Sequence, residues 1–319
     1  MKKYDLIIIG AGPTGICCGI EASKAGLSYL IVDKGVLVNS LYNFPVNMTF
    51  FSTSLKLEIG NVPFISHTDK PTRGEALEYY RRVVAAYDLN IQFRTKVNQI
   101  EKENELFNIK TDDEELKAKN VVIATGFYDS PRLLNIEGEE LPKVKHYYDD
   151  AHLYIGQDII VVGGANSACD AALETWSKGA NVTMVVREKE LYEKVKYWIL
   201  PNIKNRINEG SIKAYFNSKL SKIKKHSAEI STPEGIIELK NDYILAMTGY
   251  KPDYNWLKSI GIKFNEDEYK TPTYNPNTLE SNVKGLYLAG VILSGLATSS
   301  LFIENTRHHR TLIIKNIMK

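Results

Sequence analysis

Two stretches of the chain share one arrangement, in which a run of apolar residues leads directly into a glycine-rich turn and a helix of small residues. The first reads DLIIIGAGPTG over residues 5–15, and the second reads DIIVVGGANSA over residues 158–168. An apolar run of this length before such a turn is typical of a parallel strand buried on both faces. We therefore expect an α/β chain with two Rossmann-like dinucleotide-binding domains.

The first turn has G-x-G-x-x-G spacing, with glycines at positions 10, 12 and 15. In this motif Gly10 permits the tight turn, Gly12 lets the backbone approach a pyrophosphate, and Gly15 allows close helix packing. A helix is expected over residues 14–24. The next apolar strand ends in Asp33, which is placed to accept a hydrogen bond from a ribose hydroxyl.

The second turn departs from this spacing, because Ala165 and Ala168 follow Gly163 where the motif has glycines. A helix is expected from Ser167 to Lys178. After the next strand the chain reads Arg187-Glu188-Lys189. Two cations at this point suit the 2′-phosphate of NADPH, whereas Glu188 alone would suit NADH, and an ordinary charged strand end is the third interpretation.

Two further strands close on a Thr-Gly turn, VVIATG at 121–126 and YILAMTGYKPD at 243–253. Both are expected to be places where the chain crosses between domains. This predicts a first domain over residues 1–126, a second domain inserted over residues 127–247, and a return to the first domain over residues 248–319.

The composition narrows the partners and the compartment. With 40 Lys and Arg against 38 Asp and Glu, nucleic acid and anionic membranes are not expected as partners. The apolar runs are too short to cross a bilayer or to form a signal peptide. Three cysteines, Cys17, Cys18 and Cys169, indicate a reduced compartment, the cytoplasm. No Cys/His cluster predicts a metal, and His308 and His309 are expected to be exposed or to cap a terminal helix.

The motifs resemble the two-dinucleotide flavoprotein reductases built like low-molecular-weight thioredoxin reductase. The likeness covers essentially the whole chain through GAGPTG, NFP at 43–45, ATG, VVGGANSA, TGYKPD and GLYLAGV at 285–291. The resemblance implies FAD at the first turn and NADPH at the second. Thioredoxin reductases carry a CxxC pair before the second turn, but here His146 and Asp149 hold those positions, which excludes a dithiol relay. Val291 also replaces the Asp that usually holds the flavin side chain.

These departures are similar to those of the YpdA family, described as bacillithiol disulfide reductases that use NADPH and FAD. Further similar segments are NMTFFSTS at 47–54, IGNVPF at 59–64, KYWILP at 196–201 and LFIENTRHH at 301–309. That family commonly has cysteine in the first turn, where this chain has Thr14, which cannot act as a thiolate. Cys17 and Cys18 lie one helical turn further on and are expected to be core residues, as is Cys169.

The expected site residues follow from the motifs and the resemblance. Phe51 and the segment 299–301, at a helix start, are expected beside the flavin ring. Alternatively, Phe51 is a core residue. The residues expected to hold FAD are Gly10, Gly12, Pro13, Thr14, Gly15, Asp33, Lys34, Phe51, Val97, Thr125, Gly126, Gly290, Ser299, Ser300 and Leu301. Those expected to hold NADPH are Gly163, Ala165, Asn166, Ser167, Ala168, Arg187 and Lys189. No catalytic acid or base is assigned, because hydride transfer between rings depends on positioning.

The expected acceptor is bacillithiol disulfide or a related small disulfide. An alternative is a ferredoxin or flavodoxin reductase, for which the basic run at Lys219, Lys222, Lys224 and Lys225 could bind the partner or could be a solvated strand face. A slow flavin redox sensor is the third possibility. A homo-oligomer, dimer or tetramer, is expected.

Overall fold

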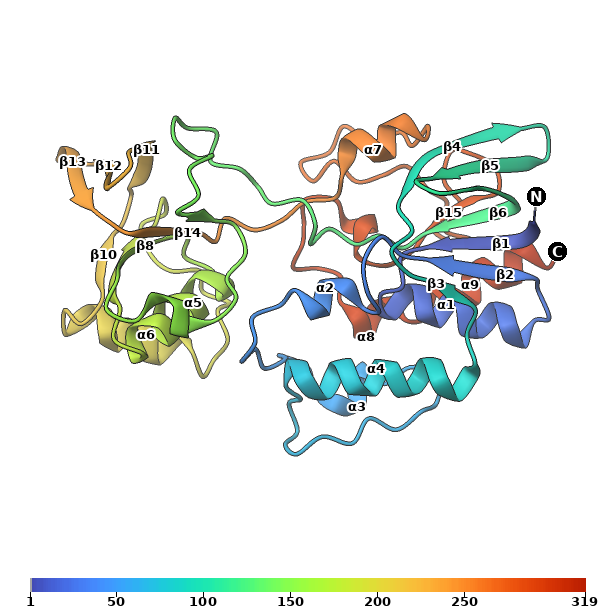
Figure 1. Ribbon diagram of the computed structural model, residues 1–319, viewed down its shortest axis with the longest axis horizontal. Coiled ribbons are helices and arrows are strands. Elements are labelled where there is room, and N and C mark those ends of the chain that lie inside the picture. The colour runs from blue at the N-terminus through green and yellow to red at the C-terminus, as the bar shows by residue number, and fades with distance from the viewer. Residues whose placement is uncertain (1) are drawn as a thin grey trace. The chain divides into compact units, whose positions relative to one another are not determined.

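The computed structural model describes residues 2–319 and divides into two compact units (Figure 1). Unit 1 contains the chain up to Asn43, Met48–Ser130 and Tyr250–Lys319. Unit 2 contains Phe44–Asn47 and Pro131–Gly249. The sequence had placed the joins after residues 126 and 247 and had left the segment 44–47 in the first domain. In the structure this segment belongs to unit 2, where the amide of Val46 donates to the carbonyl of Asp149 over 3.1 Å.

Unit 1 is built on a seven-stranded sheet of order β3-β2-β1-β6-β5-β4, with β15 beside β6. The strands β1, β2, β3, β6 and β15 are parallel, and β4 and β5 form an antiparallel extension. Their bounds are β1 Lys3–Ile9, β2 Tyr29–Val32, β3 Ile91–Gln92, β4 Val97–Glu103, β5 Leu106–Thr111, β6 Glu115–Ile123 and β15 Leu286–Leu288.

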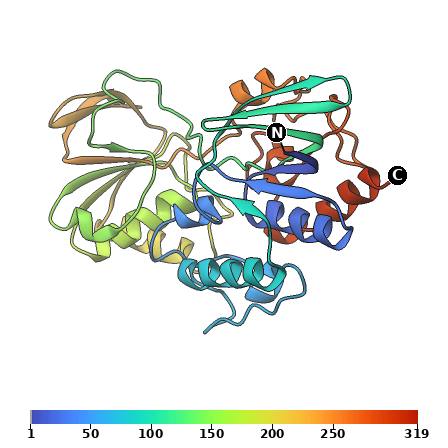
Figure 2. The ribbon, with the colours of Figure 1, turned by 45° about the vertical axis from the view of Figure 1, so that its right-hand side comes forward.

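Helix α1 (Pro13–Lys24) packs on β1 and β2 and against α9 (Figure 2). Its buried face carries Ile16 and Ile20, which complete the apolar layer over the sheet. The other helices of the unit are α2 Asn39–Tyr42, α3 Ser54–Leu57, α4 Arg73–Tyr87, α7 Tyr254–Ser259, the short 3₁₀ helix η2 Gly290–Ser294, α8 Ile303–Thr306 and α9 His309–Ile317.

Unit 2 has a five-stranded parallel sheet of order β10-β9-β8-β14-β7 and a three-stranded antiparallel sheet, β11-β12-β13. The strands are β7 Val144–Lys145, β8 Asp158–Val162, β9 Asn181–Val185, β10 Lys213–Tyr215, β11 Lys219–Ile223, β12 Ser227–Thr232, β13 Gly235–Lys240 and β14 Tyr243–Ala246. The helices are η1 Ala151–Tyr154, α5 Asn166–Ser177 and α6 Leu200–Asn208. Two apolar clusters, one including α5 and the other including the antiparallel sheet, cover the parallel strands.

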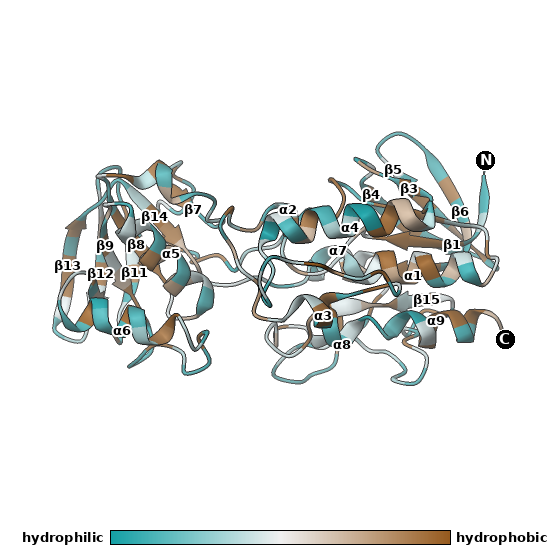
Figure 3. Cartoon of the chain, turned by 90° about the horizontal axis from the view of Figure 1, so that it is seen from below, coloured by the Kyte–Doolittle hydropathy of each residue, from teal (hydrophilic) through white to brown (hydrophobic). Residues whose placement is uncertain are grey.

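The central parallel strands, among them β1, β8 and β14, are apolar and buried (Figure 3). Strands buried on both faces must be apolar throughout, which is why the runs LIII and IIVV were readable from the sequence. The carboxyl ends of parallel strands share one sheet edge, where ligands bind in open α/β sheets. Strands β1 and β8 each end at this edge of their own sheet, just before the two glycine-rich turns. Among residues 2–319, no helix is both long and apolar enough to span a membrane.

Candidate functional site

The first site lies at the carboxyl edge of the unit 1 sheet, where backbone hydrogen bonds bring distant segments together. The amide of Gly10 donates to Val32 over 2.8 Å, and the amide of Ala124 donates to Ile9 over 2.8 Å. A third bond, from the amide of Ala289 to Ile123, is 2.9 Å long. These bonds gather most of the residues that the sequence assigned to FAD, namely Gly10 to Gly15, Asp33, Thr125, Gly126 and Gly290.

The three glycines of the first turn have different roles. Gly10 has φ +110°, and a Cβ there would lie 2.5 Å from the carbonyl oxygen of Ala124. A Cβ on Gly15 would lie 1.9 Å from the carbonyl oxygen of Gly10. A Cβ on Gly12 would meet no protein atom within 4 Å. The fold itself therefore requires Gly10 and Gly15, whereas Gly12 leaves a gap that a pyrophosphate can enter.

Helices α1 and α5 both begin without a side-chain cap, at Gly12 and Ala165. Helix α4, in contrast, has a capping box in which Thr72 and Glu75 bond to each other's backbone amides. An uncapped first turn presents backbone N–H groups and the positive end of the helix dipole, which together bind phosphate. Pro13 has no N–H to lose at the first helical position. Both turns fit the pyrophosphate of a dinucleotide.

Asp33 is held at the end of β2 by the turn that it supports. Its Oδ2 accepts from the amide of Ala11 over 2.7 Å, and its Oδ1 accepts from the amide of Gly35 over 2.8 Å. Burial is the main influence on its pKa, which is raised. Each oxygen keeps a second lone pair, so the bond to a ribose hydroxyl stays a prediction. The neighbouring Lys34 forms an ion pair with Asp129, 3.0 Å long.

Local contacts also place Val97 and Gly126 close to this edge. The amide of Thr95 donates to the carbonyl of Asp33 over 2.8 Å. Val97, the buried first residue of β4, follows two positions later and so lies near Asp33. Gly126 has φ +67°, and a Cβ there would lie 3.9 Å from Val291. The Thr125-Gly126 turn is thus next to the segment in which Val291 replaces the expected acid.

Thr14 belongs to a hydrogen-bonded group at the same edge. Its Oγ1 lies 3.1 Å from Oγ1 of Thr306, a fully buried residue of α8. Thr306 donates its own hydrogen to the carbonyl of Phe302 over 2.8 Å, so Thr14 is the donor in the pair of hydroxyls. A Cβ on Gly290 would lie 3.2 Å from the Thr14 hydroxyl. The hydroxyl of Thr14 therefore connects α1 to α8.

His309 was not found by sequence reasoning, and the expectation that it is exposed or a cap is wrong. It is buried, and its Nδ1 accepts from the amide of Gly290 over 3.0 Å. Burial lowers its pKa to about 4, which leaves the ring neutral at pH 7. Of the two neighbouring histidines, His308 is the exposed one, and it is the N-cap of α9. Gly290, which His309 supports, has φ +83°. In the sequence, the one feature that could have indicated a buried histidine was the pair His308-His309 at the start of a helix otherwise rich in Ile and Leu.

The two segments expected beside the flavin ring are only partly as predicted. Phe51 is 59 % exposed, so its alternative role as a core residue is wrong, and Lys70 Nζ lies 4.8 Å from its ring centre. The segment 299–301 does not begin a helix, because α8 starts at Ile303 with Phe302 as its N-cap. Ser299 and Ser300 lie in the turn before it. Their proximity to a flavin stays a prediction.

All three cysteines are free thiols with fully buried side chains, which confirms that they are core residues. Burial raises the pKa of Cys17 to about 11 and that of Cys169 to about 12, and it raises the pKa of Cys18 as well. Because the thiolate is the nucleophile, none of the three is poised for disulfide exchange at pH 7.

The second turn is supported by a loop of its own unit. Gly163 has φ +130°, and a Cβ there would lie 2.7 Å from the carbonyl oxygen of Met247 and 3.1 Å from Cβ of Ala168. The amide of Lys196 donates to Oδ1 of Asn166 over 2.8 Å, and its ammonium pairs with Asp170 over 2.8 Å. The Asn166 side chain is thus committed to the protein, whereas Ala165 and Ser167 are exposed at the helix start.

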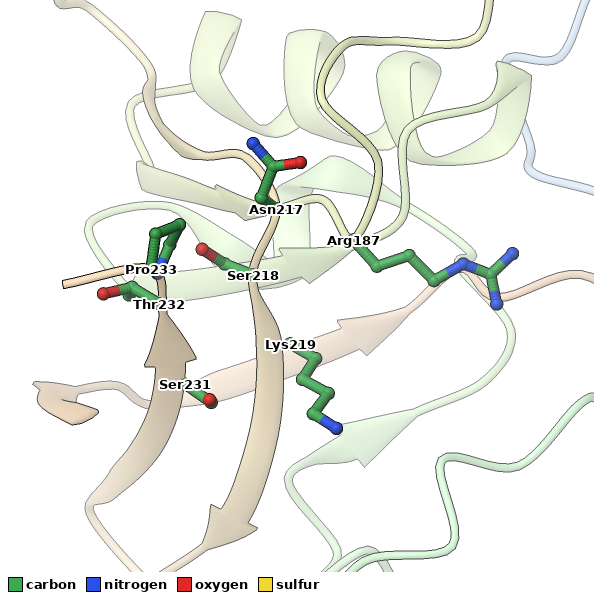
Figure 4. A pocket seen from close by; sticks show the side chains of 7 residues that line it. All are labelled: Arg187, Asn217, Ser218, Lys219, Ser231, Thr232 and Pro233. Carbon is green, nitrogen blue, oxygen red and sulfur yellow. The ribbon is translucent and has the colours of Figure 1, made fainter. Parts of the chain in front are cut away.

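Arg187 and Lys189 follow β9 on an exposed segment. Arg187 Nε donates to Oε1 of Glu188 over 2.6 Å, and Lys189 Nζ lies 3.9 Å from Glu190. An open pocket adjoins Arg187 but not Lys189 (Figure 4); it is lined by Arg187, Asn217, Ser218, Lys219, Ser231, Thr232 and Pro233. Across residues 2–319, no group of three or more His, Cys, Asp or Glu side chains could hold a metal ion.

Comparison with known proteins identifies the family. The family described as pyridine nucleotide-disulphide oxidoreductase matches residues 7–290. The chain belongs to this family. It is therefore an oxidoreductase that uses FAD and a pyridine nucleotide, as the two turns indicated.

Two individual matches refine this assignment within the family. A protein of Bacillus subtilis named bacilliredoxin reductase Bdr is 41 % identical over 100 % of this chain and 99 % of its own length. The solved structure of bacillithiol disulfide reductase Bdr (YpdA) from Staphylococcus aureus has a TM-score of 0.97, 41 % identity, and coverage of 100 % of this chain and 99 % of that one. The resemblance to the YpdA family is thereby confirmed.

A more distant match confirms the fold. Thioredoxin reductase from Lactococcus lactis has a TM-score of 0.77 at 21 % identity, covering 99 % of this chain and 98 % of that one. At this identity the likeness concerns the fold alone. The expected class, two Rossmann-like units arranged along the chain as in thioredoxin reductase, is correct.

Proposed function

We propose that the chain reduces bacillithiol disulfide, with electrons from NADPH that pass through FAD. The observation that carries this proposal is the whole-length likeness, at 41 % identity, to a protein named for that reaction. The two uncapped helix starts support it, because each offers a pyrophosphate site in a different unit.

The residues at the unit 1 edge fit FAD. The open position at Gly12, the free first turn of α1 and the carboxylate of Asp33 would hold the pyrophosphate and a ribose. Pro13, Thr14, Lys34, Phe51, Val97, Thr125, Gly126, Gly290 and the segment 299–301 complete the proposed set. When both cofactors are bound, the nicotinamide supplies a hydride and the flavin carries the electron pair to the acceptor.

The residues of unit 2 fit NADPH. The first turn of α5, with Gly163, Ala165, Ser167 and Ala168, would receive the pyrophosphate, and Asn166 would keep the turn in place. Arg187 is exposed beside β9, where its guanidinium can reach a 2′-phosphate. This favours NADPH over NADH, although Glu188 occupies the Nε of that guanidinium.

The disulfide would be reduced without a protein thiol. The cysteines are fully buried with raised pKa values, and the Thr14 hydroxyl donates to Thr306. What remains is direct transfer of the electron pair to the disulfide, whose S–S bond would break to give two thiols with protons taken from water, while the protein binds and orients the acceptor. Three free buried thiols also suit a reducing compartment, so we propose the cytoplasm, and we propose a homo-oligomer, dimer or tetramer, on the resemblance alone.

The basic run gives little support to the alternative of a ferredoxin or flavodoxin reductase. Lys222 pairs with Glu137 over 2.8 Å, and Lys224 pairs with Glu229 and Glu238. Two of the four lysines are thus neutralised within their own unit, which weakens the attraction of the run for an acidic protein. The names of the two close relatives instead point to a bacilliredoxin or to bacillithiol disulfide as the acceptor.

Steady-state NADPH oxidation with a panel of acceptors tests the proposal. Bacillithiol disulfide, a bacilliredoxin in its mixed disulfide with bacillithiol, glutathione disulfide, ferredoxin and flavodoxin would be compared at equal concentration. We expect turnover with one or both bacillithiol compounds and none above the oxygen background with the others. Turnover with ferredoxin or flavodoxin alone would reject the disulfide assignment, and flavin reduction without turnover on any acceptor would indicate a redox sensor.

A further inference from the structure

The pocket beside β9 receives cations from two separate elements. Arg187 follows β9, and Lys219 is the first residue of β11 (Figure 4). Ser231 on β12 lies directly opposite Lys219 in the antiparallel register. The lining therefore contains two cations, an amide and three hydroxyl groups, and it contains no carboxylate. Such a lining suits a phosphate group and disfavours a cation.

Backbone hydrogen bonds fix these elements next to each other. Beyond the paired ends of β9 and β10, the amide of Val186 donates to the carbonyl of Tyr215 over 2.9 Å, and the amide of Ser218 donates to Val186 over 3.0 Å. The amide of Asn217 donates to the carbonyl of Glu188 over 3.0 Å. The loop before Lys219 is thus hydrogen-bonded to the residues on either side of Arg187. This loop lies at the edge of the sheet where the parallel strands end.

Lys219 differs from Lys222 and Lys224 in having no carboxylate within ion-pair distance in the described part of the chain, residues 2–319. Lys222 and Lys224, in contrast, each form ion pairs with glutamates of the same unit. Arg187 uses only Nε for Glu188. Its two terminal nitrogens are not bonded to Glu188 and can therefore donate to an anion, as can the Lys219 ammonium.

We propose that Lys219, together with Arg187, forms the binding site for the 2′-phosphate of NADPH and thereby determines the coenzyme preference. The proposal rests on the assignment of unit 2 to the pyridine nucleotide. The Ser231 hydroxyl, across the strand pair from Lys219, supplies a neutral donor to the same phosphate. Lys189, which the sequence favoured as the second cation, does not line this pocket, and the proposed site does not include it.

Calorimetric titration of the purified holoenzyme tests this assignment without turnover. The probes are adenosine 2′,5′-bisphosphate, which carries the 2′-phosphate, and adenosine 5′-monophosphate, which lacks it. In Lys219→Ala the affinity for the bisphosphate should fall about ten- to a hundredfold, because a charge-assisted hydrogen bond is lost. Affinity for the monophosphate should not change. The matched control Lys189→Ala should lose less than about fivefold for either probe.

Each outcome decides the proposal. Lys219→Ala with unchanged affinity for the bisphosphate overturns it, and so does a loss shared equally by both probes or a larger loss in Lys189→Ala. Lys219→Arg should keep the preference for the bisphosphate, because the charge remains. Parent protein that binds both probes equally would reject the NADPH assignment itself, which separates that failure from an error about Lys219 alone.

Discussion

At the scale of single residues, His309 makes the stability of the protein depend on pH. Its pKa is lowered to about 4 in the folded state, and the ordinary value of about 6.5 applies after unfolding. As the pH falls below 6.5, the unfolded chain binds the proton first, so the folded state loses stability between these two values. The stabilisation is fully present above about pH 6.5 and amounts to roughly 3 kcal/mol relative to pH 4.

We expect His309→Gln to remove this part of the pH dependence, because glutamine can accept from the amide of Gly290 without titrating. Urea unfolding at about pH 7 and about pH 5 would measure the difference in unfolding free energy. The exposed neighbour provides the control, since His308→Gln should retain the slope of the parent. An unchanged slope in His309→Gln would show that other groups set the acid stability.

A second prediction at this scale concerns the three thiols. The combined variant Cys17→Ala, Cys18→Ala and Cys169→Ala should keep flavin reduction by NADPH and turnover with the natural acceptor. It should lose roughly 1 kcal/mol of stability per site, because each side chain is fully buried. Stopped-flow flavin reduction followed by turnover, normalised to flavin content, measures both properties. Lost turnover with intact flavin content would contradict the thiol-free route.

Thr14→Cys provides the comparison for that experiment. If the natural acceptor is a disulfide, the parent already reduces it and the added thiol is not required. Disulfide reduction that appears only in Thr14→Cys would show that the natural acceptor of the parent is not a disulfide. The substitution also removes the hydroxyl bond to Thr306, so flavin content must be measured in the same preparation.

At the scale of elements, the start of α1 predicts a separation between folding and cofactor binding. Gly12→Val should fold, because its Cβ meets no protein atom within 4 Å and its φ of −74° suits any residue. The added side chain would fill the space for the pyrophosphate, so the purified protein should be colourless or depleted in FAD. Flavin absorbance per chain and far-ultraviolet circular dichroism would measure the two properties separately.

Gly15→Ala is the matched comparison for the same helix. Its Cβ would lie 1.9 Å from the carbonyl oxygen of Gly10, so this smaller change should disturb the fold itself. Full flavin occupancy in Gly12→Val would show that the pyrophosphate does not approach this turn.

The elements also show which features a sequence can predict. Both glycine-rich turns and their strands were predictable, because a strand, a tight turn and a helix start depend on adjacent residues. The buried position of His309 was not, because it depends on Gly290, a contact set by the packing of α9. The sequence also predicted the start of α8 too early. The N-cap of α8 is Phe302, which is not a usual capping residue, and its amide donates to the side-chain oxygen of Asn305.

The cations of unit 2 give the clearest case. Arg187 and Lys189 are close in sequence, and periodicity alone could not show that only Arg187 lines the pocket. Lys219 lies more than thirty positions further on, and a loop bonded to the backbone of Val186 and Glu188 brings it to the pocket that Arg187 also lines. Sequence patterns report local chemistry, whereas cations from different strands come together only through the sheet.

At the scale of the whole molecule, ligands of the two units should stabilise them separately. Two of the three tryptophans, Trp176 and Trp198, belong to unit 2, so tryptophan fluorescence reports mainly on that unit. NADP⁺ at about 100 times its dissociation constant should stabilise the unit that binds it by about 2.7 kcal/mol. We expect the tryptophan transition to shift upward by several degrees and the release of flavin to shift less. A shift in flavin release alone would place the nucleotide site in unit 1.

The ends of the inserted unit are held together by the chain itself. The amide of Arg132 donates to the carbonyl of Gly249 over 2.9 Å within unit 2, and the amide of Lys251 donates to Ser130 over 2.9 Å within unit 1. Residues 131–249 make up unit 2 apart from Phe44–Asn47, and for the host unit they are equivalent to one long hairpin loop that is closed by two adjacent crossings. A module with neighbouring ends can be exchanged as a cassette during evolution or by engineering, so that electron donors can be changed while the flavin-bearing host keeps its fold.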